Sequence, residues 1–174
     1  MSYAKQLLDA HPGSVTADAS VLAATIDALS DCAQACTADA DNDLREQNLA
    51  EMVTCIRLCW DCADVCTATL GVVTRQTARD ANVTRPLLQA CIAICKSCGD
   101  ECQRHAHHHE HCRVCEQACR RCEQACRELL GTLPGALVAL TVEAAVVTRC
   151  HWPAPARLPN GATATDRSSR ARHS

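Results

Sequence analysis

The cysteines of this 174-residue chain are spaced like side chains that share one face of a helix. Fifteen of the sixteen lie between positions 32 and 126, nearly all of them three or four residues from the next. Residues three and four positions apart lie on the same side of an α-helix. Each run therefore takes the positions that leucine or isoleucine fills in an ordinary helix bundle. The runs are Cys32 and Cys36; Cys55, Cys59, Cys62 and Cys66; Cys91, Cys95, Cys98 and Cys102; and Cys112, Cys115, Cys119, Cys122 and Cys126.

Turn signals between the runs predict one short helix followed by four long ones. The short helix covers about residues 3–10. Ser14 is a candidate cap for the first long helix, which is expected to run to about residue 40, and residues 39–43 are expected to form an acidic turn. The second long helix then begins near Leu44. These segments predict an all-α fold, an antiparallel up-down four-helix bundle with a short N-terminal helix.

The later helix ends are marked by glycine and proline. The second long helix has two possible ends, at Gly71 or near Ala78, and Pro86 falls in the first turns of the third, where a missing amide costs least. The fourth is expected to stop at Gly131. In an up-down bundle the first and third connections lie at one end, so the acidic turn should adjoin the histidine-rich segment 105–111.

The C-terminal part of the chain differs in character from the bundle. Residues 133–148 are apolar and rich in small side chains, which is compatible with one short helix, and the remainder is rich in Pro, Ala, Ser and Arg. That composition predicts disorder. We therefore expect a four-helix bundle metal-binding domain over residues 1–131 and a partly disordered extension over residues 132–174.

Composition limits which side chains can fill the core, and the sequence also indicates the cellular compartment. The chain has no Phe, one Tyr and two Trp, so something other than aromatic rings must fill its core. The net charge is −3, and the basic residues are interspersed among acidic ones, so nucleic acid is not an expected partner. No apolar stretch is long enough for a membrane span, so a membrane is not an expected partner either. The N-terminus lacks the apolar run of a secretory signal, which predicts a cytoplasmic location. In a reducing compartment these cysteines indicate metal or redox chemistry rather than disulfides.

The spacing distinguishes among the metals that thiolates select, which are copper(I), zinc and iron–sulfur clusters. Copper(I) is satisfied by two thiolates, which one pair on a helix face supplies. Zinc needs four ligands in a tetrahedron, usually from two loop-borne pairs, and ferredoxin runs end in Cys-Pro, which is absent here. The pattern favours storage and buffering of several Cu(I) ions. A zinc or cadmium thiolate buffer is the alternative, and an iron–sulfur electron carrier is a weaker one.

Two further hypotheses are a helix bundle that only binds other proteins and an enzyme. A single buried cysteine usually acts as a small hydrophobic side chain, but leucine would pack four such faces better. No nucleophile is paired with a base and an orienting acid, and no glycine-rich loop is built to hold phosphate, so catalysis is not predicted. A binding protein is therefore expected.

Histidines near the predicted end of the bundle are candidate ligands, because imidazole binds copper. They are His105, His107, His108 and His111. Asp61, between two cysteines, could face either the core or solvent, and Trp60 is expected to pack against a neighbouring helix or subunit. Cys150 has no helical partner thiol and is left out of the site.

The motifs Cys98-Gly-Asp-Glu-Cys102, Cys112-Arg-Val-Cys115 and Cys119-Arg-Arg-Cys122-Glu-Gln-Ala-Cys126 resemble those of the cytosolic four-helix-bundle copper storage proteins of bacteria. The resemblance covers about residues 1–131. It implies a homotetramer of bundles, each of which stores many copper(I) ions through paired thiolates, and it makes a copper chaperone or chelator a possible partner for loading and release. The ligands that it implies are all fifteen bundle cysteines, with His105 and His111 at the mouth.

Overall fold

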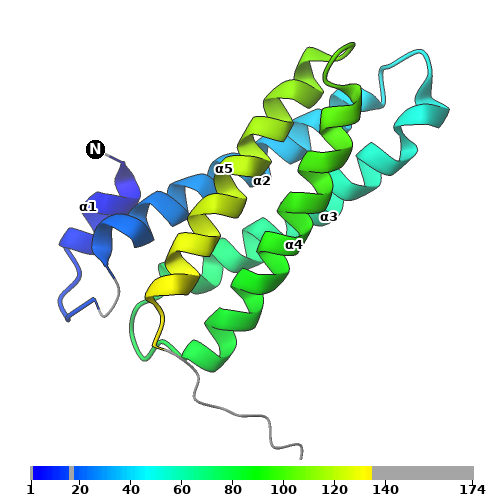
Figure 1. Cartoon of the computed structure of the whole chain (residues 1–174). Coiled ribbons are helices and arrows are strands. Elements are labelled where there is room, and N and C mark those ends of the chain that lie inside the picture. Colours follow the sequence, from blue (N-terminus) through cyan, green and yellow to red (C-terminus); the bar gives the residue numbers. More distant parts are fainter. Residues whose placement is uncertain (1, 16–17, 135–174) are drawn as a thin grey trace, which may run out of the picture. The chain divides into compact units, whose positions relative to one another are not determined.

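The computed structural model describes residues 2–15 and 18–134, which form five helices and no strands. The helices are α1 (Tyr3–Asp9), α2 (Ala19–Asp43), α3 (Leu49–Thr74), α4 (Ala81–His105) and α5 (Glu110–Thr132). The four long helices run up and down beside one another, each packed on two of the others, and α1 lies against α2 (Figure 1). The predicted four-helix bundle with a short N-terminal helix is confirmed. None of these helices is both long enough and apolar enough to span a membrane.

The predicted extension lies largely outside the described residues, so the boundary after residue 131 stays a prediction. The disorder predicted for its last part and the short helix predicted over residues 133–148 lie there too. Helix α5 ends one residue beyond Gly131, at Thr132.

Aspartates begin two of the long helices. Asp18 Oδ1 accepts hydrogen bonds from the backbone N–H groups of Ser20 and Val21, at 2.8 and 3.2 Å, and this satisfies donors that the first helical turn leaves free. The cap of this helix is therefore Asp18 and not the candidate Ser14. Asp80 caps α4 in the same way, and Pro86 lies inside α4 near its start, as expected.

The expected acidic turn at residues 39–43 is instead the last part of α2. Asp39 and Asp43 continue the four-three spacing of Cys32 and Cys36, so they lie on the same face of the helix. Their side chains are almost completely buried, at 2% and 0% exposure. The carboxylates thus belong to the interior of the bundle.

The ends of α3 and the connection between α4 and α5 also differ from expectation. Helix α3 begins at Leu49 rather than near Leu44, and it runs through Gly71 to Thr74. The histidine-rich segment is split, because α4 continues to His105 and α5 already begins at Glu110. The connection between them is therefore shorter than predicted.

The lining of the bundle changes along its axis. All fifteen bundle cysteines are buried, none more than 1% exposed. At the end formed by the start of α2 and the end of α3, the interior is instead closed by leucine, valine and threonine side chains: Leu22, Thr25, Leu29, Thr69, Val73, Thr84, Leu88 and Leu129. The three threonine hydroxyls donate to backbone carbonyls of their own helices. The thiol-lined interior is therefore sealed at this end and meets buried carboxylates, Asp39 and Asp43, at the other.

Helices α4 and α5 approach closely at Gly99. A Cβ atom at this position would lie 3.3 Å from Cys119 Cβ and 3.2 Å from Arg120 Cζ. Arg120 in turn binds Asp100 at 2.8 Å and Glu116 at 3.1 Å. The missing side chain lets the thiols of the two helices meet across the interior.

Candidate metal centre

Sulfur atoms from different helices converge on the interior of the bundle. Cys36 of α2 lies 3.9 Å from Cys98 of α4 and 3.6 Å from both Cys115 and Cys119 of α5. Cys59 of α3 lies 3.6 Å from the same Cys98 sulfur. All four long helices thus supply sulfur to one cluster.

The sulfurs form a series of overlapping groups of four, whose atoms all lie within 4.8 Å of one another. These groups include Cys32, Cys66, Cys95 and Cys122; Cys32, Cys36, Cys62 and Cys119; Cys36, Cys98, Cys115 and Cys119; and Cys59, Cys98, Cys102 and Cys115. Consecutive groups share at least one cysteine. A shared thiolate can bridge two ions, so the groups make a continuous row of potential sites rather than separate ones.

The fifteen cysteines of the bundle are free, with no disulfide among them. Their closest contacts run from 3.6 to 4.0 Å, far beyond the bond of about 2.05 Å in a disulfide. An ion bound at about 2.3 Å, the length of a zinc–thiolate bond, spans such a gap between two sulfurs. The spacing therefore suits metal bridging.

The protonation of the core follows from its crowding. Contacts with Cys122 and other neighbouring thiols, together with burial, raise the pKa of Cys95. Contacts with Cys115 and its neighbours, and again burial, raise the pKa of Cys36. These thiols keep their protons in the metal-free protein, because a row of buried anions without cations would be strongly disfavoured.

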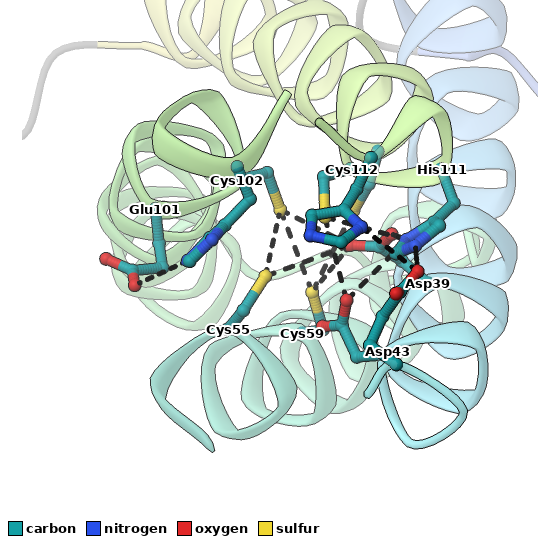
Figure 2. Close-up of polar contacts among 12 residues, drawn as sticks. Asp39, Asp43, Cys55, Cys59, Glu101, Cys102, His111 and Cys112 are labelled. Atoms are coloured by element: carbon teal, nitrogen blue, oxygen red, sulfur yellow. Dashed lines mark hydrogen bonds and ion pairs between the residues drawn. The ribbon is translucent and has the colours of Figure 1, made fainter. Parts of the chain in front are cut away.

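Asp39 lies where the thiol row reaches the polar end of the bundle, called here the mouth, at which Asp39, Asp43, His111 and Cys112 come together (Figure 2). The thiols of Cys59 and Cys102 each donate to Asp39 Oδ2 over 3.4 Å, and that of Cys55 does so over 4.0 Å. The four donor atoms lie within 4.8 Å of one another. At the mouth, one group of the row therefore contains a carboxylate among its sulfurs.

His111 extends the same cluster toward the surface. Its Nδ1 lies 2.7 Å from Asp39 Oδ1, and its Nε2 lies 3.1 Å from Glu46 Oε1. Cys112 Sγ is 3.5 Å from His111 Nδ1 and 3.6 Å from Asp43 Oδ1 (Figure 2). The predicted neighbourhood of the acidic and histidine-rich segments is thus confirmed, although the carboxylates come from a helix.

Burial sets the acidity of the mouth groups. It raises the pKa of Asp39 to about 6 and that of Asp43 to about 8, with the negative charges of nearby thiolates and carboxylates adding to the effect. Burial alone would lower the pKa of His111, but hydrogen bonds to Asp39 and Glu46 outweigh it and raise that pKa. The hydrogen bond from His111 lowers the pKa of Glu46. The two inner carboxyls therefore hold their protons to a higher pH than an ordinary aspartate does, and the imidazole of His111 also binds its proton more tightly than usual.

The other candidate residues lie farther from the thiol row. His105 Nε2 is 3.3 Å from Glu101 Oε1, and His107 and His108 are exposed in the α4–α5 connection. Asp61 faces solvent and pairs with Arg57 at 2.9 Å, which resolves the choice that the sequence left open. Of the predicted histidines, only His111 has a contact with a thiol in the structure.

Asp39, Asp43 and Glu46 were not among the residues predicted for the site. The signal for the first two was present, since the four-three spacing of the α2 cysteines continues through both aspartates. Because residues 39–43 were predicted to form a turn, this helical spacing was not applied to them. Glu46 lies in the α2–α3 connection, where no helical spacing applies.

Comparisons with known proteins point to one family. Residues 18–131 match the sequence model of a family described as copper storage protein. The chain is also 37% identical over 95 residues to the uncharacterized cysteine-rich protein YhjQ of Bacillus subtilis (strain 168), a match that covers 55% of this chain and 82% of that protein.

Solved structures of copper storage proteins resemble the bundle. Ccsp from Streptomyces lividans, loaded with 10 copper equivalents, is 54% identical, with 75% of this chain and 99% of that one covered and a TM-score of 0.73. A cytosolic copper storage protein from Streptomyces lividans, in a structure with five coppers, is 58% identical. The match covers 66% of this chain and 96% of that one, with a TM-score of 0.65. Cu(I)-bound BsCsp3 is 33% identical, with 62% and 95% covered and a TM-score of 0.55.

Proposed function

This chain belongs to the copper storage protein family, and from that membership we propose that it stores and buffers many copper(I) ions along the thiol-lined interior of its bundle. The observation that carries the proposal is the row of overlapping groups of four buried sulfurs. The proposed ligands are the fifteen bundle cysteines. Relatives of similar fold are loaded with copper, in one case with 10 equivalents.

The chemistry of the row suits a soft monovalent ion. Copper(I) prefers thiolates, and sulfurs that bridge two ions allow on the order of one copper per cysteine. Each copper ion neutralises one thiolate, so a filled interior carries little net charge despite its burial. Loading releases the thiol protons. The closed bundle is therefore more stable with copper than without it.

Copper enters and leaves through the mouth in this proposal, because leucine and threonine close the opposite end. His111 lies between the surface and the first thiols, with Cys112 3.5 Å away, and so can pass copper inward. His105 contributes from the rim, where it pairs with Glu101. A copper chaperone or a small chelator delivers and removes the ions.

We also propose that the protein acts in the cytoplasm as a homotetramer and is a store rather than a catalyst. The Streptomyces lividans relative is a cytosolic copper storage protein, which supports the cytoplasmic location. Exposed apolar side chains on α3 support an interface, since Leu49, Val53 and Trp60 are 43%, 60% and 43% exposed. Their spacing of four and seven places them along one outer face of the helix.

Anaerobic titration of the reduced protein with copper(I) against a chromophoric chelator tests the proposal. We expect on the order of one copper per bundle cysteine, retained against excess zinc. Saturation at one or two equivalents would refute storage. Loss of copper to zinc would favour the zinc or cadmium buffer, and acid-labile sulfide in a brown, anaerobically purified sample would favour the iron–sulfur carrier.

A further inference from the structure

Three donor atoms, one nitrogen, one oxygen and one sulfur, form a nearly equilateral triangle at the mouth. His111 Nδ1, Asp43 Oδ1 and Cys112 Sγ lie 3.6, 3.6 and 3.5 Å apart, edge by edge (Figure 2). A tetrahedral zinc ion with bonds of about 2.0–2.3 Å keeps its ligands about 3.3–3.6 Å from one another. The triangle therefore has the size of one face of such a coordination shell.

Two further carboxylates complete the surroundings of this triangle. Asp39 Oδ1 lies 2.7 Å from His111 Nδ1, so a second buried carboxylate borders the triangle. Glu46 Oε1 lies 3.1 Å from the other ring nitrogen. A carboxylate in that place orients a metal-bound histidine and makes its ring a better donor.

The other oxygen of the Asp43 carboxylate has no partner, and this is an independent sign of a cation. The side chain of Asp43 is completely buried, and its Oδ2 has no hydrogen-bond partner. Burying a carboxylate oxygen without a partner is costly, and more so with Asp39 beside it. A positive ion between the carboxylates, the imidazole and the thiol would remove that cost.

The donor set differs from that of the deeper row. Soft copper(I) gains little from carboxylate oxygen, whereas zinc accepts oxygen, nitrogen and sulfur together. We propose that the mouth binds one divalent cation of the zinc class through His111, Asp43 and Cys112, with Asp39 as the fourth ligand. Glu46 orients His111. The site goes beyond copper storage, and its occupant competes with copper(I) at the entrance but not at the deeper thiols.

Cobalt(II) is the probe for this site, because it replaces zinc and absorbs visible light. Titrating the reduced, metal-free full chain with Co²⁺ under anaerobic conditions should give one tight equivalent, with tetrahedral absorption and a sulfur-to-cobalt charge-transfer band. Zn²⁺ should displace it. Asp43→Asn and Cys112→Ser should abolish this equivalent, and Glu46→Gln should weaken it by about 10- to 100-fold. Asp41→Asn, which removes the same charge from the exposed side of α2, should leave it unchanged.

The outcomes separate this site from the storage row. A first cobalt equivalent that keeps its spectrum and affinity in Asp43→Asn would overturn the proposal, because that ion would then lie among the deeper thiols. Circular dichroism of each variant reports whether the bundle has formed, and Glu46→Gln, at the partly exposed rim, still tests the site if Asp43→Asn does not fold. Copper uptake is measured separately, so storage can fail while the cobalt site stands, or the reverse.

Discussion

Replacing Asp43 with asparagine should flatten the pH dependence of the stability of the metal-free protein between about pH 6 and pH 8. The perturbed group is surrounded by Asp39 on its own helix, Cys55 on α3, and His111 and Cys112 on α5. Burial, followed by the charges of Cys55 and Asp39, raises the pKa of Asp43 from 3.8 to about 8. A carboxyl with a raised pKa binds its proton more tightly in the folded state. Its stabilising contribution is therefore full below pH 3.8 and is lost as the pH rises through about 8.

The magnitude follows from the proton that only the folded protein holds in this window. Each pH unit changes the free energy of unfolding by about 1.4 kcal/mol for such a proton. From pH 6 to pH 8 the wild type should lose about 2 kcal/mol that the asparagine variant does not lose. Asp39 and His111 titrate with the same sign in both proteins, so they largely cancel in the difference.

Urea denaturation followed by circular dichroism measures this effect, with the protein reduced, anaerobic and stripped of metal at each pH. The matched control is Asp41→Asn, whose curve should run parallel to that of the wild type because the carboxylate it removes is exposed. Parallel curves for Asp43→Asn and the wild type would show that Asp43 is already ionised at pH 6. The reasoning from burial and an unpaired oxygen would then be refuted.

Three further outcomes are expected. Cys95→Ser removes a sulfur within 4.0 Å of four others, so chelator competition should show a copper capacity lower by about one or two ions, and an unchanged capacity would contradict bridging. Loading the wild type should release roughly one proton per copper ion, measured with an indicator dye in weak buffer, and no release would mean that the thiols were already ionised. Gly99→Val should destabilise the apo bundle by about 1–3 kcal/mol in urea denaturation, because its side chain meets Cys119 and Arg120; wild-type stability would show that α4 and α5 can separate freely.

Much of the thiol row could be predicted from spacing alone. The run from Cys112 to Cys126 places every cysteine on one face of a helix, and each of them is buried. The amphipathic pattern is a local property, since helix geometry repeats every 3.6 residues wherever the helix lies. The prediction of an interior made of sulfur therefore needed no knowledge of the neighbouring helices.

The mouth was harder to predict because it depends on where helices end. Ser14 and Asp18 are both good caps, and five residues at the end of α2 could be helix or turn until the opposing helices were known. Packing against α3 and α5 makes burial of Asp39 and Asp43 possible by supplying thiol and imidazole donors. Local propensity gives no weight to such distant partners.

The amino-acid order was thus sufficient for the presence of the helices, though not for all their ends, and for their facing sides and the soft donors along them, because these follow from residue spacing within a single segment. Which sulfurs meet, and which carboxylates and imidazole stand at the entrance, emerged only from the packed bundle. Those contacts join residues far apart in the sequence, such as Cys32 and Cys119, which are 87 positions apart. They exist because four separate helices press the same kind of face against a shared axis.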